Sequence, residues 1–280
     1  MTSFQKLAAL VVLMGAAITW HFVQARATER KLAQQASTYR LQAEQGDAAA
    51  QFRLSGAYYR GKGVPQDYLQ AAFWCRKAAD QGYAKAQNAL GVLYIRGQGL
   101  PQDYAEALRW NRKAADQGYA KAQYDLGTMY YYGQGVPQDY GEALGWYRKA
   151  ADQNDLAAQT VLAWMYYYGR GVSRDYAEAF RWYHKAADQN DPAAEAALGS
   201  MYFHGTGVSP DYAEAIRWYH KAADRGNASA QYALGYMYYY GEGMPPNRSE
   251  AIHWYWKASL QGNEQAQSAL GQIATKMREW

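Results

Sequence analysis

The chain has 280 residues, with 29 Lys or Arg, 25 Asp or Glu and a formal net charge of +4 at pH 7. Charges of both signs alternate along it without a basic run, which argues against a nucleic-acid-binding protein and indicates a solvated outer face. The single cysteine, Cys75, excludes an internal disulfide framework and is expected to be a structural residue.

The N-terminal segment differs in kind from the rest of the chain. Lys6 precedes an apolar run over residues 7–20, and Val23-Gln24-Ala25 then places small residues where a signal peptidase cleaves. Residues 1–25 are therefore predicted to be a secretory signal peptide. The alternative is an uncleaved membrane anchor, because residues 7–23 only just reach the roughly 17–25 residues that span a bilayer.

A repeat with a fixed period fills most of the remaining chain. Six tryptophans, from Trp74 to Trp254, are spaced thirty-six residues apart. Such a period indicates an array of one supersecondary unit. The predicted units are residues 47–82, 83–118, 119–154, 155–190, 191–226 and 227–262. Residues 26–46 are expected to form a linker and an N-terminal capping helix, since Tyr39 stands one period before Cys75.

Each unit begins with a predicted helix, called helix A here. In the second unit Ala86, Leu90 and Tyr94 follow the i, i+4, i+8 spacing of one helix face. Gly91 lies inside this helix, where glycine costs about 1 kcal/mol relative to alanine. Its recurrence predicts that the backbone of another helix packs closely at this point.

A glycine-rich turn leads to the second helix of each unit, helix B. Gly97 is expected to take the left-handed conformation that ends helix A, and Pro101 prevents the helix from continuing. Asp103 is a good N-cap, and Glu106 follows three residues later. This pair is close to a capping box, which satisfies backbone donors in both directions. Helix B ends near Gly118.

The pattern AxxALGxxYxxGxGVxxDYxxAxxWYxKAADQG resembles the Sel-one-like repeat (SLR) family, a branch of the tetratricopeptide-like α-solenoids. The resemblance covers residues 47–262. It implies an all-α fold, a right-handed superhelix of about six helix–turn–helix repeats of 36 residues. Residues 263–280 match helix A but lack the turn glycine, so they are expected to form a C-terminal capping helix that runs to Arg278. The family and the signal sequence together imply a periplasmic or secreted protein, or repeats held outside the cytoplasm by residues 7–23.

The resemblance also implies that helix A lines a concave groove and that the protein is an adaptor for a protein or peptide partner. At variable positions of helix A the chain carries an aromatic ladder, and aromatic side chains are enriched at interfaces. These rings could equally pack on one another or on helix B. The predicted partner-binding residues are Tyr131, Tyr132, Trp164, Tyr167, Tyr168, Phe203, His204, Tyr236, Tyr239 and Tyr240. By contrast, the core of the repeats is expected to hold Tyr94, Tyr130, Tyr166, Tyr202 and Tyr238.

No constellation for chemistry stands out in the sequence. His184 and His220 occupy equivalent positions one repeat apart without a third ligand, and are expected to be solvated or stacking side chains. The sequence therefore predicts no catalytic, cofactor or metal site and a protein that is not an enzyme. An envelope glycan or peptidoglycan is the alternative partner, and an enzyme is a remote alternative. Membrane contact is expected only through the N-terminal segment, if it is uncleaved.

Overall fold

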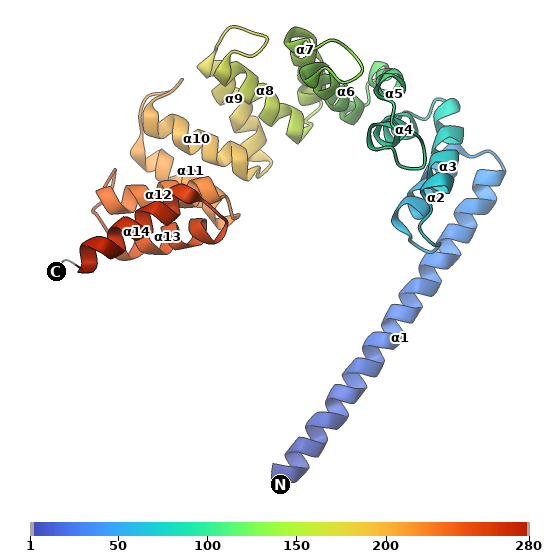
Figure 1. Ribbon diagram of the computed structural model, residues 1–280, viewed down its shortest axis with the longest axis horizontal. Coiled ribbons are helices and arrows are strands. Elements are labelled where there is room, and N and C mark those ends of the chain that lie inside the picture. The colour runs from blue at the N-terminus through green and yellow to red at the C-terminus, as the bar shows by residue number, and fades with distance from the viewer. Residues whose placement is uncertain (1–2, 279–280) are drawn as a thin grey trace. The chain divides into compact units, whose positions relative to one another are not determined.

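The computed structural model describes the backbone of residues 3–278 and the side chains of Trp20 and residues 23–276. Over these residues the chain forms fourteen α-helices and no strand, which confirms an all-α solenoid of about six repeats (Figure 1). The helices are α1 Ser3–Glu44, α2 Ala48–Arg60, α3 Tyr68–Asp80, α4 Ala84–Arg96, α5 Tyr104–Asp116, α6 Ala120–Tyr132, α7 Tyr140–Asp152, α8 Leu156–Tyr168, α9 Tyr176–Asp188, α10 Pro192–His204, α11 Tyr212–Asp224, α12 Ala228–Tyr240, α13 Arg248–Leu260 and α14 Glu264–Arg278.

The chain divides into two compact units. The first is Met1–Ala122 with Gln134–Val136, and the second is Gln123–Gly133 with Pro137–Trp280. Helices α1 to α5 lie in the first unit, and α7 to α14 with most of α6 lie in the second. The even-numbered helices are the helices A of the repeats, and the odd-numbered helices from α3 to α13 are the helices B.

Helix α1 contains both the predicted signal peptide or anchor and most of the predicted linker. Most of the side chains on which the signal-peptide (1–25) and anchor (7–23) predictions rest, those of residues 1–19, 21 and 22, lie outside the described residues. Among the described residues, none of the helices combines the length and apolarity needed to cross a membrane.

The last turns of α1 take the place of a helix B in front of the first repeat. Ala36 and Ala43 are buried, and Ala43 belongs to one apolar cluster with Leu54 of α2 and Trp74 of α3. The ring of Tyr39 lies against the same cluster, so these turns pack on the first repeat.

The periodic tryptophans form the inner layer of helix B. All six are buried, with 3–8% of their surface exposed, beside alanines that are fully or almost fully buried. A lysine three residues later covers each indole ring. The Lys149 Nζ atom, for example, lies 3.8 Å from the ring centroid of Trp146, a favourable cation–π distance. The tryptophans are therefore core residues of each repeat.

The turn is fixed by two glycines in the left-handed region. Gly97 ends α4 with φ +63°, as predicted, and Gly99 follows with φ +71°. A Cβ atom on Gly99 would lie 1.9 Å from the carbonyl oxygen of Tyr68, at the start of the preceding helix B. The second glycine is thus required twice, by its φ angle and by the close approach of the previous repeat.

The predicted capping box is only half correct. Asp103 caps α5, because its carboxylate accepts from the backbone N–H groups of Ala105 and Glu106 at 2.9 and 3.0 Å. The backbone N–H of Asp103, however, donates to the carbonyl of Tyr94 at 3.1 Å and not to Glu106. The Glu106 carboxylate instead accepts from its helix neighbours, Arg109 at 2.7 Å and the Trp110 indole N–H at 3.1 Å.

The glycine inside helix A is also explained differently from the prediction. A Cβ on Gly199 would lie 2.6 Å from the ring of Tyr219, and a Cβ on Gly235 would lie 2.5 Å from the ring of Tyr255. At these two glycines an aromatic ring of helix B occupies this space, whereas at Gly127 the backbone carbonyl of Ala143 in helix B lies there too, 3.2 Å from the Cβ position. Gly91 faces a side chain in the same way, that of Asn111.

A ladder of glutamine pairs, one pair to a repeat, links a buried glutamine of helix A to a glutamine at the end of helix B of the same repeat. The amide of Gln117 donates to the amide oxygen of buried Gln87 at 2.7 Å, and the same pair recurs thirty residues apart in the other repeats except one. In the fifth repeat Glu195, which is 1% exposed, and Arg225 take the places of the two glutamines, with 3.3 Å between Arg225 Nε and Glu195 Oε2. Burial raises the pKa of the Glu195 carboxyl, and the Arg225 charge opposes that shift.

The tyrosines expected in the core are not all equally buried. Tyr94, Tyr130 and Tyr166 are buried as predicted, whereas Tyr202 and Tyr238 are only partly buried. The ring of Phe180, from helix B of the preceding repeat, packs edge-on against Tyr202 with 5.4 Å between centroids.

Candidate functional site

The predicted partner-binding residues all lie on four helices A of the second unit. They occupy the last two positions of each helix and one position a turn earlier. They are Tyr131 and Tyr132 on α6; Trp164, Tyr167 and Tyr168 on α8; Phe203 and His204 on α10; and Tyr236, Tyr239 and Tyr240 on α12. We call their common surface the helix A face.

The final position of helix A is open to solvent. Tyr132, Tyr168 and Tyr240 expose 64%, 52% and 58% of their surface, and His204 is exposed at the equivalent place. Large aromatic side chains are seldom left this exposed at the same position of successive repeats without a use. These rings lie against neighbouring rings of their own helix but leave more than half of their surface open for contact.

The penultimate position is instead held by helix B of the same repeat. Tyr131 packs on Tyr140 with 4.9 Å between ring centroids, and Tyr167 packs on Tyr176 with 5.1 Å. Both rings of helix A are partly buried. These side chains therefore have a packing role whatever else they do. Phe203 packs in the same way on Tyr212, whereas Tyr239 has Arg248 at the corresponding place.

A third aromatic position links one helix A to the next. The Tyr131 and Trp164 rings meet edge to face across α6 and α8, with 6.3 Å between centroids. Two repeats later Phe203 and Tyr236 meet in the same way across α10 and α12, again at 6.3 Å. The second unit thus carries two similar aromatic pairs at equivalent places.

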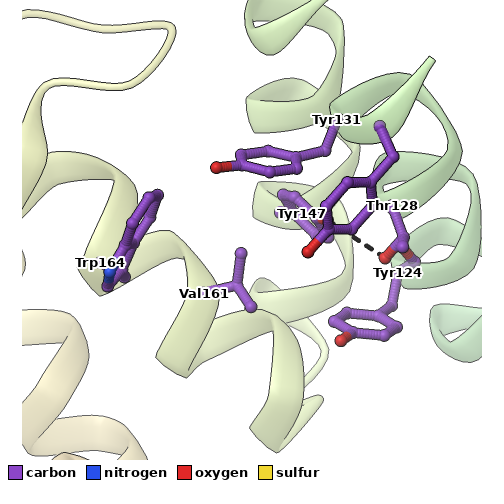
Figure 2. Close-up of a pocket in the computed structure, with 7 residues that line it drawn as sticks. Tyr124, Thr128, Tyr131, Tyr147, Val161 and Trp164 are labelled. Atoms are coloured by element: carbon purple, nitrogen blue, oxygen red, sulfur yellow. Dashed lines mark hydrogen bonds between the residues drawn. The ribbon is translucent and has the colours of Figure 1, made fainter. Parts of the chain in front are cut away.

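Below the first pair the surface is hollowed (Figure 2). The hollow has a volume of about 190 Å³. Tyr131 and Trp164 stand on opposite sides of it, and Tyr147 of helix B lies at its floor with its hydroxyl donating to Thr128 Oγ1 at 3.1 Å. Its lining residues are Tyr124, Thr128, Tyr131, Tyr132, Tyr147, Val161 and Trp164.

Two further hollows have the same construction. One, of about 320 Å³, lies between α10 and α12 with Tyr219 beneath it. The other, of about 360 Å³, lies between α12 and α14 with Tyr255 beneath it. The lining of the α10–α12 hollow is Phe203, His204, Tyr219, Tyr232, Ala233, Tyr236 and Met237. The α12–α14 hollow is more polar, because Glu264, Gln265 and Gln272 contribute to it.

The floors of these hollows are neutral at physiological pH. Burial raises the pKa of the Tyr219 hydroxyl to about 12, and it also raises the pKa of Tyr147. Among the described residues that line the α6–α8 and α10–α12 hollows, none is Asp, Glu, Lys or Arg. These two surfaces suit neutral, apolar groups that can also accept a hydrogen bond.

The floor tyrosines were not among the predicted site residues. Tyr147, Tyr219 and Tyr255 follow the core tryptophan in helix B, so a repeat pattern alone assigns them to the core. The sequence signal that could have placed them is the glycine inside helix A, because the Tyr147 ring lies against Gly127 and the Tyr255 ring lies against Gly235. Without a side chain at that glycine, the ring can extend into the hollow beside helix A.

The paired histidines are stacking side chains, as predicted. His184 lies edge-on against Trp218 with 5.2 Å between centroids, and His220 lies against Trp254 with 5.5 Å. Within the described residues, no three His, Cys, Asp or Glu side chains are grouped closely enough to hold a metal ion. Cys75 is buried and unpaired, and burial raises the pKa of its thiol to about 12.

The repeats match a known family. The Sel1 repeat matches six consecutive segments, each beginning one residue after the unit boundary drawn from the sequence: residues 48–83, 84–119, 120–155, 156–191, 192–227 and 228–263. No curated protein matches the chain.

Solved structures agree with this match. A protective antigen present in uropathogenic Escherichia coli strains, which displays an SLR fold, is 40% identical with a TM-score of 0.80, covering 84% of this chain and 50% of the antigen. This chain therefore spans half the length of that antigen. A Sel1 repeat protein from Oxalobacter formigenes is 37% identical with a TM-score of 0.71, covering 77% of this chain and 89% of that protein.

The chain belongs to the Sel1 repeat family. Proteins built from these repeats are generally scaffolds for protein–protein interaction and generally not catalysts.

Proposed function

We propose that this protein is a non-enzymatic, exported scaffold that binds a protein or peptide partner through the helix A face of its later repeats. The observation that carries the proposal is the recurrence of exposed aromatic rings, Tyr132, Tyr168 and Tyr240, at one position of three repeats. Solenoids commonly bind along the surface formed by such equivalent positions.

Aromatic rings at these places suit binding energetically. A tyrosine brings a large apolar area and a hydroxyl group to an interface and loses little side-chain entropy when it is ordered. Tyr132, Tyr168 and Tyr240 leave more than half of their surface in water, so a partner can still gain from covering them. The half-buried rings of Tyr131 and Tyr167 hold the exposed rings in place, with centroids 4.9 Å apart in each neighbouring pair.

Export is the second part of the proposal, and it is supported by the N-terminal sequence. A charged residue, an apolar run and the Val23-Gln24-Ala25 pattern succeed one another as in secretory signals. The N-terminus of the exported protein is expected to begin at Arg26. Intact residue 1 in a cytosolic fraction would contradict export, and intact residue 1 in a membrane fraction would indicate an anchor.

An envelope glycan is a second candidate ligand, and one hollow of the surface favours it. The α12–α14 hollow combines Tyr236 and Tyr240 with the side chains of Glu264, Gln265 and Gln272. Sugar recognition needs such polar groups beside a stacking ring. Binding of peptidoglycan fragments that is lost on Gln265→Ala, with partner binding unchanged, would support this candidate.

The test is partner capture by the full chain and by two matched variants. Tyr132→Ala, Tyr168→Ala and Tyr240→Ala are combined in one variant, which removes three rings that are more than half exposed. Loss of an interface hot spot costs about 2 kcal/mol or more, roughly a thirtyfold loss of affinity. The variant is expected to lose capture of an identified partner while keeping its thermal melt.

The control is Trp256→Ala, which removes an aromatic side chain of similar exposure, 53%, from helix B of the last repeat. Capture that survives the triple substitution, or that is lost equally in the control, would contradict binding through the helix A face.

A further inference from the structure

We propose that the partner segment is proline-rich and binds as a polyproline II helix, with proline rings seated in the α6–α8 and α10–α12 hollows. This rests on the proposed function of the helix A face and names the chemistry of its partner. Three features of the hollows lead to it: their size, their hydrogen-bonding groups and their spacing.

The hollows fit single side chains better than whole small molecules. Their volumes are about 190 and 320 Å³. Sites for drug-sized ligands occupy roughly 300–1,000 Å³, so the first hollow is too small for such a ligand and the second is at the lower limit. Apolar walls of Trp164 and Val161 in one, and of Phe203 and Met237 in the other, match a compact, uncharged ring.

The first hollow offers two groups that can donate a hydrogen bond and have no partner among the described residues, a tyrosine hydroxyl and an indole N–H. Tyr132 and Trp164 at the first hollow make no hydrogen bond to another described residue. The carbonyl oxygens at the end of helix A accept from the turn that follows; that of Tyr131, for example, accepts from the Gln138 side chain at 2.8 Å. The indole N–H of Trp164 can only donate, so a partner that presents free carbonyl oxygens is needed to satisfy it. Proline has no N–H, and the carbonyls of a polyproline II helix lack internal partners and can accept from the free hydroxyl and indole groups.

The aromatic pairs supply the walls that such a helix needs. Proline-rich segments are recognised in grooves lined by aromatic rings, where their preformed conformation keeps the entropic cost of binding low. Tyr131 with Trp164, and Phe203 with Tyr236, present the same edge-to-face geometry at 6.3 Å two repeats apart. The two hollows are therefore equivalent seats for two proline rings of one segment.

The spacing of the seats sets the length of the segment. Packed helices lie roughly 8–10 Å apart, so seats two repeats apart are separated by roughly 16–20 Å. A polyproline II helix rises about 3.1 Å per residue. Two seated prolines should then be separated by about five to seven residues, and a segment of about ten residues is needed to fill both seats.

The charge of the surface excludes another class of peptide. With no charged side chain among the described residues that line the two hollows, an acidic or phosphorylated peptide finds no cation there. The equivalent final helix A positions of the first unit are Arg60 and Arg96, whereas those of the later repeats are Tyr132, Tyr168, His204 and Tyr240.

The experiment measures fluorescence polarisation of a labelled decaproline peptide titrated with the full chain. Wild-type protein is expected to bind decaproline at least tenfold more tightly than pentaproline, because only the longer peptide reaches both seats. A ten-residue alanine–glutamine peptide is the negative control. Equal binding of decaproline and this control would overturn the proposal.

Three variants locate the binding. Trp164→Ala and Tyr236→Ala should each weaken decaproline binding at least tenfold and bring it near the pentaproline value. Trp164→Phe, which keeps an aromatic ring and loses the indole N–H, should weaken it less than Trp164→Ala does. Circular dichroism melts identify any variant that unfolds, and Trp256→Ala should bind as the wild type does. Unchanged decaproline affinity in both folded alanine variants would also overturn the proposal.

The two proposals can fail separately. If decaproline does not bind while the Tyr132, Tyr168 and Tyr240 triple variant loses its natural partner, the proline-rich inference is wrong but partner binding through the helix A face is supported. If the triple variant keeps its partner, the proposal that the partner binds through the helix A face is contradicted as well.

Discussion

Replacement of Trp182 by alanine tests the packing on which every other statement depends. Trp182 is 7% exposed and lies in one apolar cluster with Leu162 of α8 and Leu198 of α10, so it joins consecutive repeats. The Lys185 Nζ atom covers the ring at 3.9 Å from its centroid. Truncation of such a buried tryptophan removes these contacts and leaves a cavity, which costs about 3–5 kcal/mol.

The size of the expected change in melting temperature follows from the chain length. Unfolding entropy near 60 °C is about 2.1 cal/mol/K per residue, or ~0.6 kcal/mol/K for 280 residues. A loss of 3–5 kcal/mol should then lower the melting temperature by roughly 5–9 °C. If the repeats near Trp182 unfold as a smaller unit, the shift is larger and the transition broadens, because each repeat contacts only its neighbours.

The assay is thermal unfolding followed by circular dichroism, with Trp256→Ala as the matched control. Trp256 is 53% exposed, so the same substitution there should cost about 1 kcal/mol or less. Equal melting temperatures for the Trp182→Ala variant and the wild type, or equal losses in the two variants, would refute the assignment of the tryptophans to the core.

Three further predictions concern single features of the repeats. The double variant Glu195→Gln with Arg225→Gln should restore the glutamine ladder. Because burial raises the pKa of Glu195, the stability that this group gives the wild type is complete below its unfolded pKa and is lost as the pH rises through the folded pKa. Urea titrations should therefore show the variant becoming more stable relative to the wild type between pH 4 and pH 7. The Cys75 thiol, with its pKa raised to about 12, should react with a thiol reagent only after denaturation, and rapid reaction in the native protein would show that it is accessible. Gly99→Ala should destabilise the protein by more than the roughly 1–2 kcal/mol that a left-handed alanine costs, because its Cβ meets the Tyr68 carbonyl. Gly118→Ala, with open space around the new Cβ, should cost only that amount. Equal losses of stability in urea titrations would show that the turn does not approach the previous helix B.

The local features of the repeats could be predicted because their signals are local. Asp103 caps helix B and Gly97 ends helix A through backbone groups within a few residues of each. The periodic tryptophans are buried because the same environment recurs at a fixed interval. These features need no knowledge of which segment lies opposite.

Contacts across the turn could not be derived from the period. The N–H of Asp103 meets the carbonyl of Tyr94 because the turn brings the start of helix B back to helix A, and this left Glu106 free for Arg109 and Trp110. A repeat pattern identifies equivalent positions, but it does not say which of them are neighbours in space.

The difference between buried and exposed rings on the helix A face also depends on contacts across the turn. Tyr131 and Tyr132 are adjacent and chemically identical in sequence, yet Tyr131 packs on Tyr140 and Tyr132 is 64% exposed. The difference depends on a ring that approaches from helix B after the turn. The hollows likewise depend on Tyr147, which reaches past Gly127 from the opposite side.

The central claim, that a protein partner binds to the helix A face, is tested most directly by photocrosslinking. A benzophenone amino acid in place of Tyr168, in the full chain expressed in its own cells, places the reactive group at an exposed ring of that face. We expect one discrete crosslinked protein from this position and none when the same group replaces Trp256. Crosslinking from Trp256 with none from Tyr168 would contradict the claim.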